Sequence, residues 1–201
     1  MGGLVQRAIH LSVEALQQKS KNSAIEVIEH IERQVNELHR EIDQLALDLV
    51  ALHQPLAIDL RFITAATRIN GDLERMCDKA VNIAHRAISI LDGPDAGSVI
   101  EIPKMAEITE SMVAGALDAF RRRDQKLARE IVGRDDEVDQ YRNVVFQELI
   151  DEVTKEKRFV QQALDLILAS RNLERIADHA TNIAENVVFM VAGNDIRHHA
   201  G

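Results

Sequence analysis

The sequence predicts an all-α protein built as a tandem repeat of two three-helix bundles, with six long helices. Only three prolines interrupt 201 residues, and long stretches between them are rich in Ala, Leu, Glu, Arg and Gln, which favour helix. No segment keeps the alternation of apolar and polar residues that predicts a strand. The segment 73–84 recurs 100 residues later as 173–184, with eight of twelve positions identical. This recurrence indicates a duplicated unit.

The first repeat is expected to hold three helices. The first covers about residues 4–19. Ser23 and Glu26 have the spacing of a capping box, which would open a second helix that ends near Leu52. A turn at residues 54–55 then leads into a third helix that ends near Leu91.

The second repeat follows a segment rich in Gly, Pro, Asp and Ser at residues 92–98, a composition typical of a linker. We therefore expect the first bundle at residues 1–92, a linker at 93–102 and the second bundle at 103–201. Its helices are expected at about 103–122, 124–153 and 157–192. Asp124 would cap the second of these and Gly193 would end the third.

Composition narrows the function classes. The chain has 33 acidic residues against 24 Lys and Arg, a net charge of −9 and 3% aromatic residues, which argues against nucleic-acid binding. A single Cys suits a reducing compartment. No apolar run approaches about 20 residues, and Arg7, His10 and Glu14 interrupt any signal-peptide core. We expect a soluble cytoplasmic protein.

Pairs of acidic residues recur inside the duplicated segment. Glu74 and Asp78 are four residues apart, as are Glu174 and Asp178, and this spacing puts both side chains on one face of a helix. An antiparallel neighbouring helix would bring two more polar side chains to the same level in each repeat. The candidate metal ligands are thus Glu32, Asn36, Glu74 and Asp78 in the first repeat and Asp135, Asp139, Glu174 and Asp178 in the second. Clustered carboxylates of this kind suit a hard cation or a multinuclear site.

A plainer interpretation is a solvated helix face that the duplication copied. The paired acids point away from the apolar stripe of their own helix, so any site is expected at the surface. A buried di-iron site would need Glu-x-x-His motifs, and none of the eight histidines has Glu three residues before it. His39 with Asp43, and His179, are compatible with metal ligation and with ordinary solvated or flanking positions. No nucleophile, P-loop or zinc-protease motif occurs, so nothing indicates an enzyme.

At this level of detail the sequence resembles the PhoU family of phosphate-transport accessory proteins. The stretches that carry the resemblance are 35–43, 54–61, 73–78, 173–185 and 193–198. The resemblance implies two three-helix bundles without enzymatic activity. It also implies frequent homodimers and iron or other cations (Zn, Mn or Mg) bound on the E(D)-x-x-x-D motifs. Asn36 departs from a strict carboxylate motif.

The family role implied is negative regulation of the phosphate regulon. A member would couple the ATPase subunit of a phosphate ABC transporter to a sensor histidine kinase, and would reach the membrane only through these partners. Two alternatives remain open from the residues. One is a metal-independent acidic helical interaction module that binds basic surfaces, and the other is a carboxylate-bridged metalloenzyme.

Overall fold

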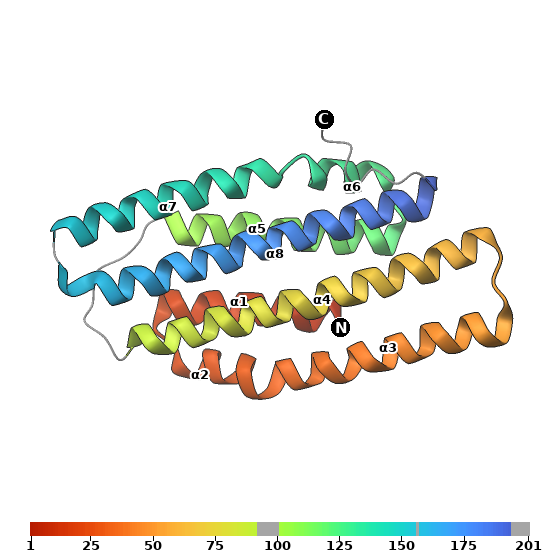
Figure 1. Ribbon diagram of the computed structural model, residues 1–201, viewed down its shortest axis with the longest axis horizontal. Coiled ribbons are helices and arrows are strands. Elements are labelled where there is room, and N and C mark those ends of the chain that lie inside the picture. The colour runs from red at the N-terminus through yellow and green to blue at the C-terminus, as the bar shows by residue number, and fades with distance from the viewer. Residues whose placement is uncertain (92–100, 156, 194–201) are drawn as a thin grey trace.

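The computed structural model describes residues 1–91, 101–155 and 157–193. Over these residues the chain is helical without strands, and two three-helix bundles lie side by side in an elongated molecule (Figure 1). The predicted fold class is confirmed. Most of the expected linker, 93–102, and the 194–198 part of the family-like C-terminal stretch lie outside the described residues.

The first bundle consists of three helical runs. They are α1 (Gly2–Gln18), then α2 (Lys21–Ile25) continued by the π-helical segment η1 (Glu26–Ile31) and α3 (Glu32–His53), and finally α4 (Ala57–Leu91).

The predicted capping box at Ser23 is wrong. Ser20 is the N-cap, and its hydroxyl accepts a hydrogen bond from the Ser23 backbone N at 3.3 Å, while the Ser23 hydroxyl donates to Glu14 of α1 at 2.7 Å.

The second bundle contains α5 (Glu101–Arg122), α6 (Gln125–Val132), α7 (Asp135–Lys155), a short 3-10 turn η2 (Lys157–Phe159) and α8 (Val160–Ala192). The expectation of one unbroken helix over 124–153 is wrong. The chain turns at residues 133–134, where the Gly133 N bonds to the Arg129 carbonyl and the Arg134 N to the Ile131 carbonyl. This break makes Asp135 the first residue of α7, where a carboxylate is favoured by the helix dipole.

Two predicted helix caps in this bundle are confirmed, the N-cap of α6 and the C-cap of α8. Asp124 Oδ1 accepts from the Lys126 and Leu127 backbone N at 3.0 and 3.1 Å. Gly193 has φ 72°, and its N donates to the Phe189 carbonyl at 2.9 Å. A left-handed residue at this position closes a helix, and glycine adopts it at the least steric cost.

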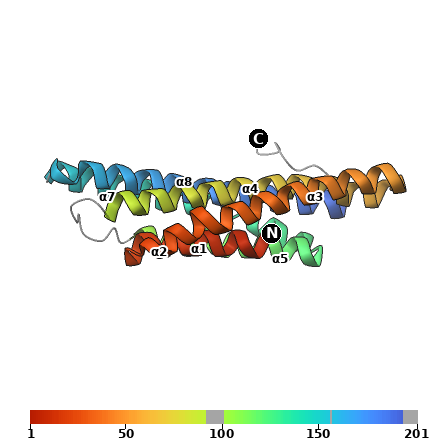
Figure 2. The same ribbon diagram turned by 90° about the horizontal axis from the view of Figure 1, so that it is seen from below.

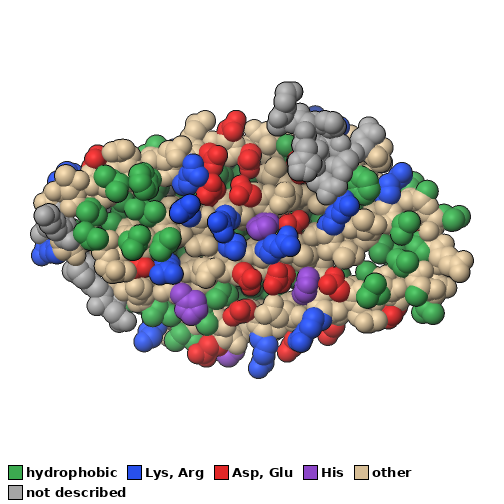
Figure 3. Space-filling model, in the orientation of Figure 1, with side chains coloured by type: hydrophobic (Ala, Val, Ile, Leu, Met, Phe, Trp, Pro, Cys, Tyr) green, Lys and Arg blue, Asp and Glu red, His purple; other side chains and the backbone are tan. Residues whose placement is uncertain are grey.

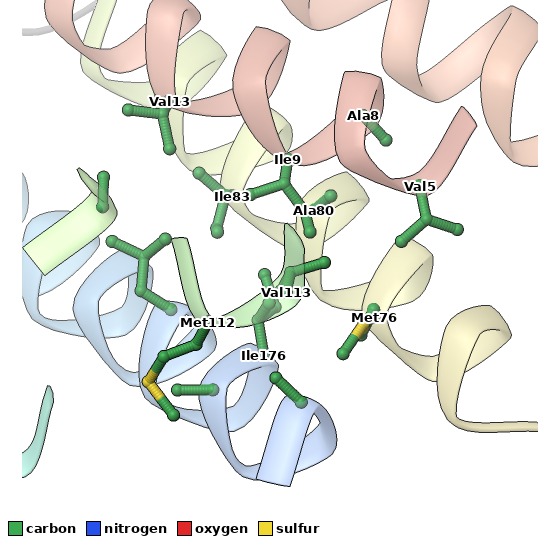
Figure 4. Packing of buried hydrophobic residues seen from close by; sticks show 14 of the residues in the cluster. Val5, Ala8, Ile9, Val13, Met76, Ala80, Ile83, Met112, Val113 and Ile176 are labelled. Carbon is green, nitrogen blue, oxygen red and sulfur yellow. The ribbon is translucent and has the colours of Figure 1, made fainter. Parts of the chain in front are cut away.

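The helices form two layers. Figure 2 shows α3, α4, α7 and α8 in one layer and α1 and α5 in the other. The antiparallel helices α4 and α8 lie at the centre and make the most extensive contact in the described structure. Their apolar stripes meet α1 and α5, as the side chains of Ile9, Met76, Val113 and Ile176 show (Figure 4). The two bundles therefore share one continuous core.

Polar contacts also join the two repeats across α4 and α8. The Asp165 carboxylate is 1% exposed, and it accepts hydrogen bonds from Arg86 Nη1 at 3.2 Å and from Ser89 Oγ at 2.8 Å. His179 Nδ1 lies 2.9 Å from Asp72 Oδ1. These contacts fix α4 against α8. The candidate site residues lie on the layer that contains these two helices. Within the described residues no helix is both long and apolar enough to cross a bilayer.

Candidate metal sites

The acidic cluster of the second repeat lies where α7 runs alongside α8. Asp135 begins α7 and Asp139 follows one turn later, while Glu174 and Asp178 are one turn apart on α8. Partial burial, together with the charges of Asp135, Glu174 and Asp139, raises the pKa of Asp178 to about 6, although part of this side chain is open to solvent. The structure thus brings these four carboxylates close enough to repel one another, as the sequence predicts.

Two further side chains complete this cluster and were missed from the sequence. Arg142 Nη1 donates to Glu174 Oε1 at 2.6 Å and lies 4.0 Å from Asp139 Oδ1. Thr181 Oγ1 donates to Asp135 Oδ1 at 3.1 Å. The spacing of Arg142, three residues after Asp139 on the same helix, could have signalled its role.

The corresponding cluster of the first repeat lies between α3 and α4. Glu32 begins α3, with Asn36 one turn later, and Glu74 and Asp78 lie on α4. Burial is the main cause that raises the pKa of the Cys77 thiol to about 12, and the charges of Asp78, Glu32 and Glu74 add to it. These three acids therefore lie near the buried Cys77.

A groove of about 540 Å³ adjoins the first-repeat cluster, and its lining includes Glu32, Asn36 and His39. His39 Nε2 lies 3.4 Å from Asp43 Oδ2, and Asn70 Nδ2 donates to Asp43 Oδ1 at 2.9 Å. The Nδ1 atom of His39 is buried without a hydrogen-bond partner. The structure thus places His39 beside two of the predicted ligands, while Asp43 is engaged with Asn70.

Most of the candidate ligands are less exposed than the helix geometry alone suggested, although Asp178 is exposed and the Asp139 side chain is 49% exposed. Glu32, Asn36, Glu74 and Asp78 are half-buried, and the Glu174 side chain is 19% exposed. The neighbouring helix, α3 or α7, covers one flank of each site. Figure 3 shows acidic side chains gathered at two places on this face, over α3 and α4 and over α7 and α8, with Lys and Arg side chains between them.

The His179 side chain joins the two repeats. Its ring contacts Asp72 of the other repeat, and the two side chains are 15% and 8% exposed. Its charge, when present, lowers the pKa of the adjacent Asp178. His179 is therefore a contact between the repeats that also moderates the charge of the acidic cluster.

The donor sets fit a hard cation in chemistry and in charge. Carboxylate and amide oxygens are ligands of Mg²⁺, Mn²⁺ and iron, and imidazole extends the range to zinc. Partial burial is the main cause of the raised pKa of Asp178, and the negative charges of Asp135, Glu174 and Asp139 add to it. Over the described part of the chain, however, no three His, Cys, Asp or Glu side chains already converge as a complete metal-binding group. A bound ion would require some of these side chains to rotate.

Comparison with known proteins adds independent information. The family model described as "PhoU domain" matches residues 1–87 and again residues 102–187. A "Phosphate-specific transport system accessory protein PhoU homolog" of Pseudomonas putida is 37% identical over 199 residues, which cover 98% of this chain and 77% of the relative. The homologue of the same description in Pseudomonas aeruginosa is 38% identical, covering 98% and 82%.

Solved structures agree with this match. The crystal structure of PhoU from P. aeruginosa superposes with a TM-score of 0.93 at 36% identity, covering 96% of this chain and 93% of that one. The crystal structure of the phosphate transport system regulatory protein PhoU from Streptococcus pneumoniae has a TM-score of 0.89 at 28% identity, covering 97% and 91%.

Proposed function

The chain belongs to the PhoU family, and we propose that it is a negative regulator of phosphate uptake that binds metal ions on its repeated acidic clusters. Its place among phosphate-transport accessory proteins rests on two PhoU-domain matches and on nearly full-length relatives. The observation that carries the metal-binding part is the pair of acidic clusters, one in each repeat, on a single face of the molecule.

We assign the proposed ligands by repeat. They are Glu32, Asn36, Glu74 and Asp78 in the first repeat and Asp135, Asp139, Glu174 and Asp178 in the second. Iron is the first candidate because the resemblance to the PhoU family implies it, and Mn, Zn and Mg are alternatives that carboxylate ligands also bind. A bound cation would supply the positive charge that offsets the repulsion among these carboxylates.

The geometry suggests how such binding would serve regulation. The acidic clusters lie on the layer formed by α3, α4, α7 and α8, which the shared core and the Asp165 contacts hold in place. Filling them with cations would change the charge of this whole face without refolding it. We propose that a phosphate ABC transporter ATPase subunit and a sensor histidine kinase contact this face in the cytoplasm, so that the protein reaches the membrane only through them.

We also propose that the protein forms a homodimer and is not an enzyme. The joined end of α3 and α4 exposes large apolar side chains, among them Leu52 at 77% and Leu56 at 81%, and exposed apolar patches favour association. The two acidic clusters are open at the surface, which supports a binding role over redox chemistry in a dry cavity. The relatives named above are described as accessory proteins.

A metal-independent interaction module is the second candidate, and one observation favours it. Arg142 already satisfies Glu174 through a 2.6 Å hydrogen bond, so part of the second cluster is neutralised by the protein itself. Under this alternative, partner binding would weaken with salt and would not respond to chelators.

The proposal is tested in a bacterial strain whose own gene for this protein is deleted, with a reporter of phosphate-starvation genes. We expect the wild-type chain to silence the reporter at high phosphate, and the variant E74Q/D78N/E174Q/D178N to silence it much less at equal abundance. Copurification of the ATPase subunit and the kinase would be measured in parallel. A chain that leaves the reporter unchanged and captures neither partner would overturn the regulatory proposal.

A further inference from the structure

We propose that Arg142 is a built-in counter-ion of the second-repeat cluster and that His39 is a metal ligand of the first. As a result, the first repeat binds metal ions more tightly than the second. This inference rests on the metal sites proposed above and concerns how the duplicated sites have diverged. It depends on one pair of matched positions. His39 follows Glu32 by seven residues, and Arg142 follows Asp135 by the same number.

The Arg142 guanidinium lies beside two carboxylates of the second cluster, where a metal ion would bind. Its guanidinium donates to Glu174 Oε1 at 2.6 Å, lies 4.0 Å from Asp139 Oδ1, and donates from Nη2 to Asn143 Oδ1 at 3.1 Å. The Arg142 and Glu174 side chains are 31% and 19% exposed, so solvent screens the pair only in part. A metal ion that uses Glu174 must therefore displace a charged group that the structure already holds there.

Arginine cannot itself become a ligand. It stays protonated at all accessible pH values and offers only hydrogen-bond donors. It therefore competes with a metal ion for the same carboxylate oxygens. Displacing it also leaves a second positive charge near the bound ion, which weakens binding further.

The first cluster carries a potential ligand at the same position. The His39 ring lines the groove with Glu32 and Asn36. Its Nε2 atom lies 3.4 Å from Asp43 Oδ2, and its Nδ1 atom is buried without a hydrogen-bond partner, so the ring must turn before either nitrogen can bind a metal ion in the groove. Imidazole nitrogen is a common ligand for zinc, iron and other transition metals. Arg33 also lines this groove, but it lies 3.9 Å from Glu37, in an ion pair directed along α3. Arg40 lines the groove as well, but among the described residues no guanidinium pairs with Glu32, Glu74 or Asp78, so the first repeat offers oxygen and nitrogen donors without a built-in counter-ion.

Metal titration of the full-length, metal-free protein tests this inference. Isothermal titration with Zn²⁺ and with Mn²⁺ would be read site by site. The second site would be studied in the E74Q/D78N background and the first in the E174Q/D178N background. We expect R142Q to tighten the second site by about tenfold or more, and H39R to weaken the first by about tenfold or more.

Arg134 provides a matched control. It lies in the turn at residues 133–134 directly before α7, and its guanidinium donates to Glu137 and Ser111 rather than to Glu174. R134Q removes the same charge as R142Q and is expected to leave the second-site affinity within about twofold of its background. Circular dichroism of each variant would verify that it is folded.

The outcomes distinguish failure of the roles of Arg142 and His39 from failure of the proposed metal sites themselves. Equal affinities in R142Q and R134Q would overturn the role of Arg142, and an unaffected first site in H39R would overturn that of His39. Failure of the wild type and of every variant to bind any tested metal would instead overturn the proposed metal sites, and this inference with them. The exchange H39R/R142H should make the second site bind the metal ion more tightly than the first.

Discussion

The Asp165 carboxylate should be a principal polar contact that holds the two repeats together, and D165N should measurably destabilise the protein. Asp165 is 1% exposed and accepts hydrogen bonds from Arg86, Ser89 and Gln161, at 3.2, 2.8 and 3.3 Å. Asn keeps the shape but loses the charge, and its NH₂ group cannot accept the hydrogen bonds that Asp165 Oδ2 receives from Ser89 and Gln161. At least one hydrogen bond is therefore lost and the ion pair is abolished.

The expected magnitude follows from opposing effects. A hydrogen bond to a charged group contributes about 1.5–3 kcal/mol, while removing a buried charge recovers part of its desolvation cost. Arg86 is 41% exposed and can be rehydrated, which also limits the loss. We expect the free energy of unfolding to fall by about 2–3 kcal/mol. At about 2–4 °C per kcal/mol for a chain of this size, the melting temperature should fall by roughly 4–12 °C.

Urea unfolding followed by circular dichroism, in EDTA, measures this change. D151N is the control, because Asp151 is exposed and accepts one hydrogen bond from Gln147 at 3.3 Å, so its effect should stay within about 0.5 kcal/mol. A double-mutant cycle of D165N with S89A should give a coupling energy of about 1 kcal/mol. A D165N protein as stable as D151N, with no coupling to Ser89, would refute this account of the repeat contact.

Three further predictions concern the core and the site. I176A removes a fully buried side chain and should lower the free energy of unfolding by about 2–5 kcal/mol in urea; a loss below about 1 kcal/mol would contradict the shared core. Because the folded pKa of Asp178 is about 6 and its usual value is 3.8, the metal-free wild type should lose stability as pH rises from about 4 to 6. D178N should remove this loss, which partial exposure limits to about 1 kcal/mol; identical pH profiles for the two proteins would contradict the pKa. Because burial and nearby acids raise the pKa of Cys77 to about 12, a thiol reagent at pH 8 should label the native protein at least about 100-fold more slowly than the urea-unfolded chain; equal rates would contradict the buried position.

The fold was largely predictable from local patterns. The repeated segment at 73–84 and 173–184 and its apolar spacing predicted the two central helices and their core faces, because burial depends on periodicity that the sequence shows directly. The break at residues 133–134 was missed, since Gly133 lies inside an otherwise helical composition and tertiary packing decides where the turn falls. The Ser20 cap was missed because Ser23 has the better motif, yet its hydroxyl is engaged by Glu14.

The positions of the acidic residues of the site could be predicted from the sequence. The basic side chains that pair with acidic residues there could not. The spacing of Glu174 and Asp178, and the register of Asp135 and Asp139 opposite them, anticipated the proximity that adds to burial in raising the pKa of Asp178. The hydrogen bond from Arg142 depends on the path of a long side chain between two helices, which sequence spacing constrains poorly. The contact of His179 with Asp72 arises from packing between repeats, and no local motif encodes it.

The metal content of the purified protein tests the central claim most directly. The wild type would be reconstituted with iron, manganese, zinc or magnesium, passed through a desalting column and analysed by mass spectrometry of the elements. We expect bound metal in the wild type, partial retention in either E74Q/D78N or E174Q/D178N, and complete loss when the four substitutions are combined. A folded wild type that retains none of the four metals would contradict this expectation.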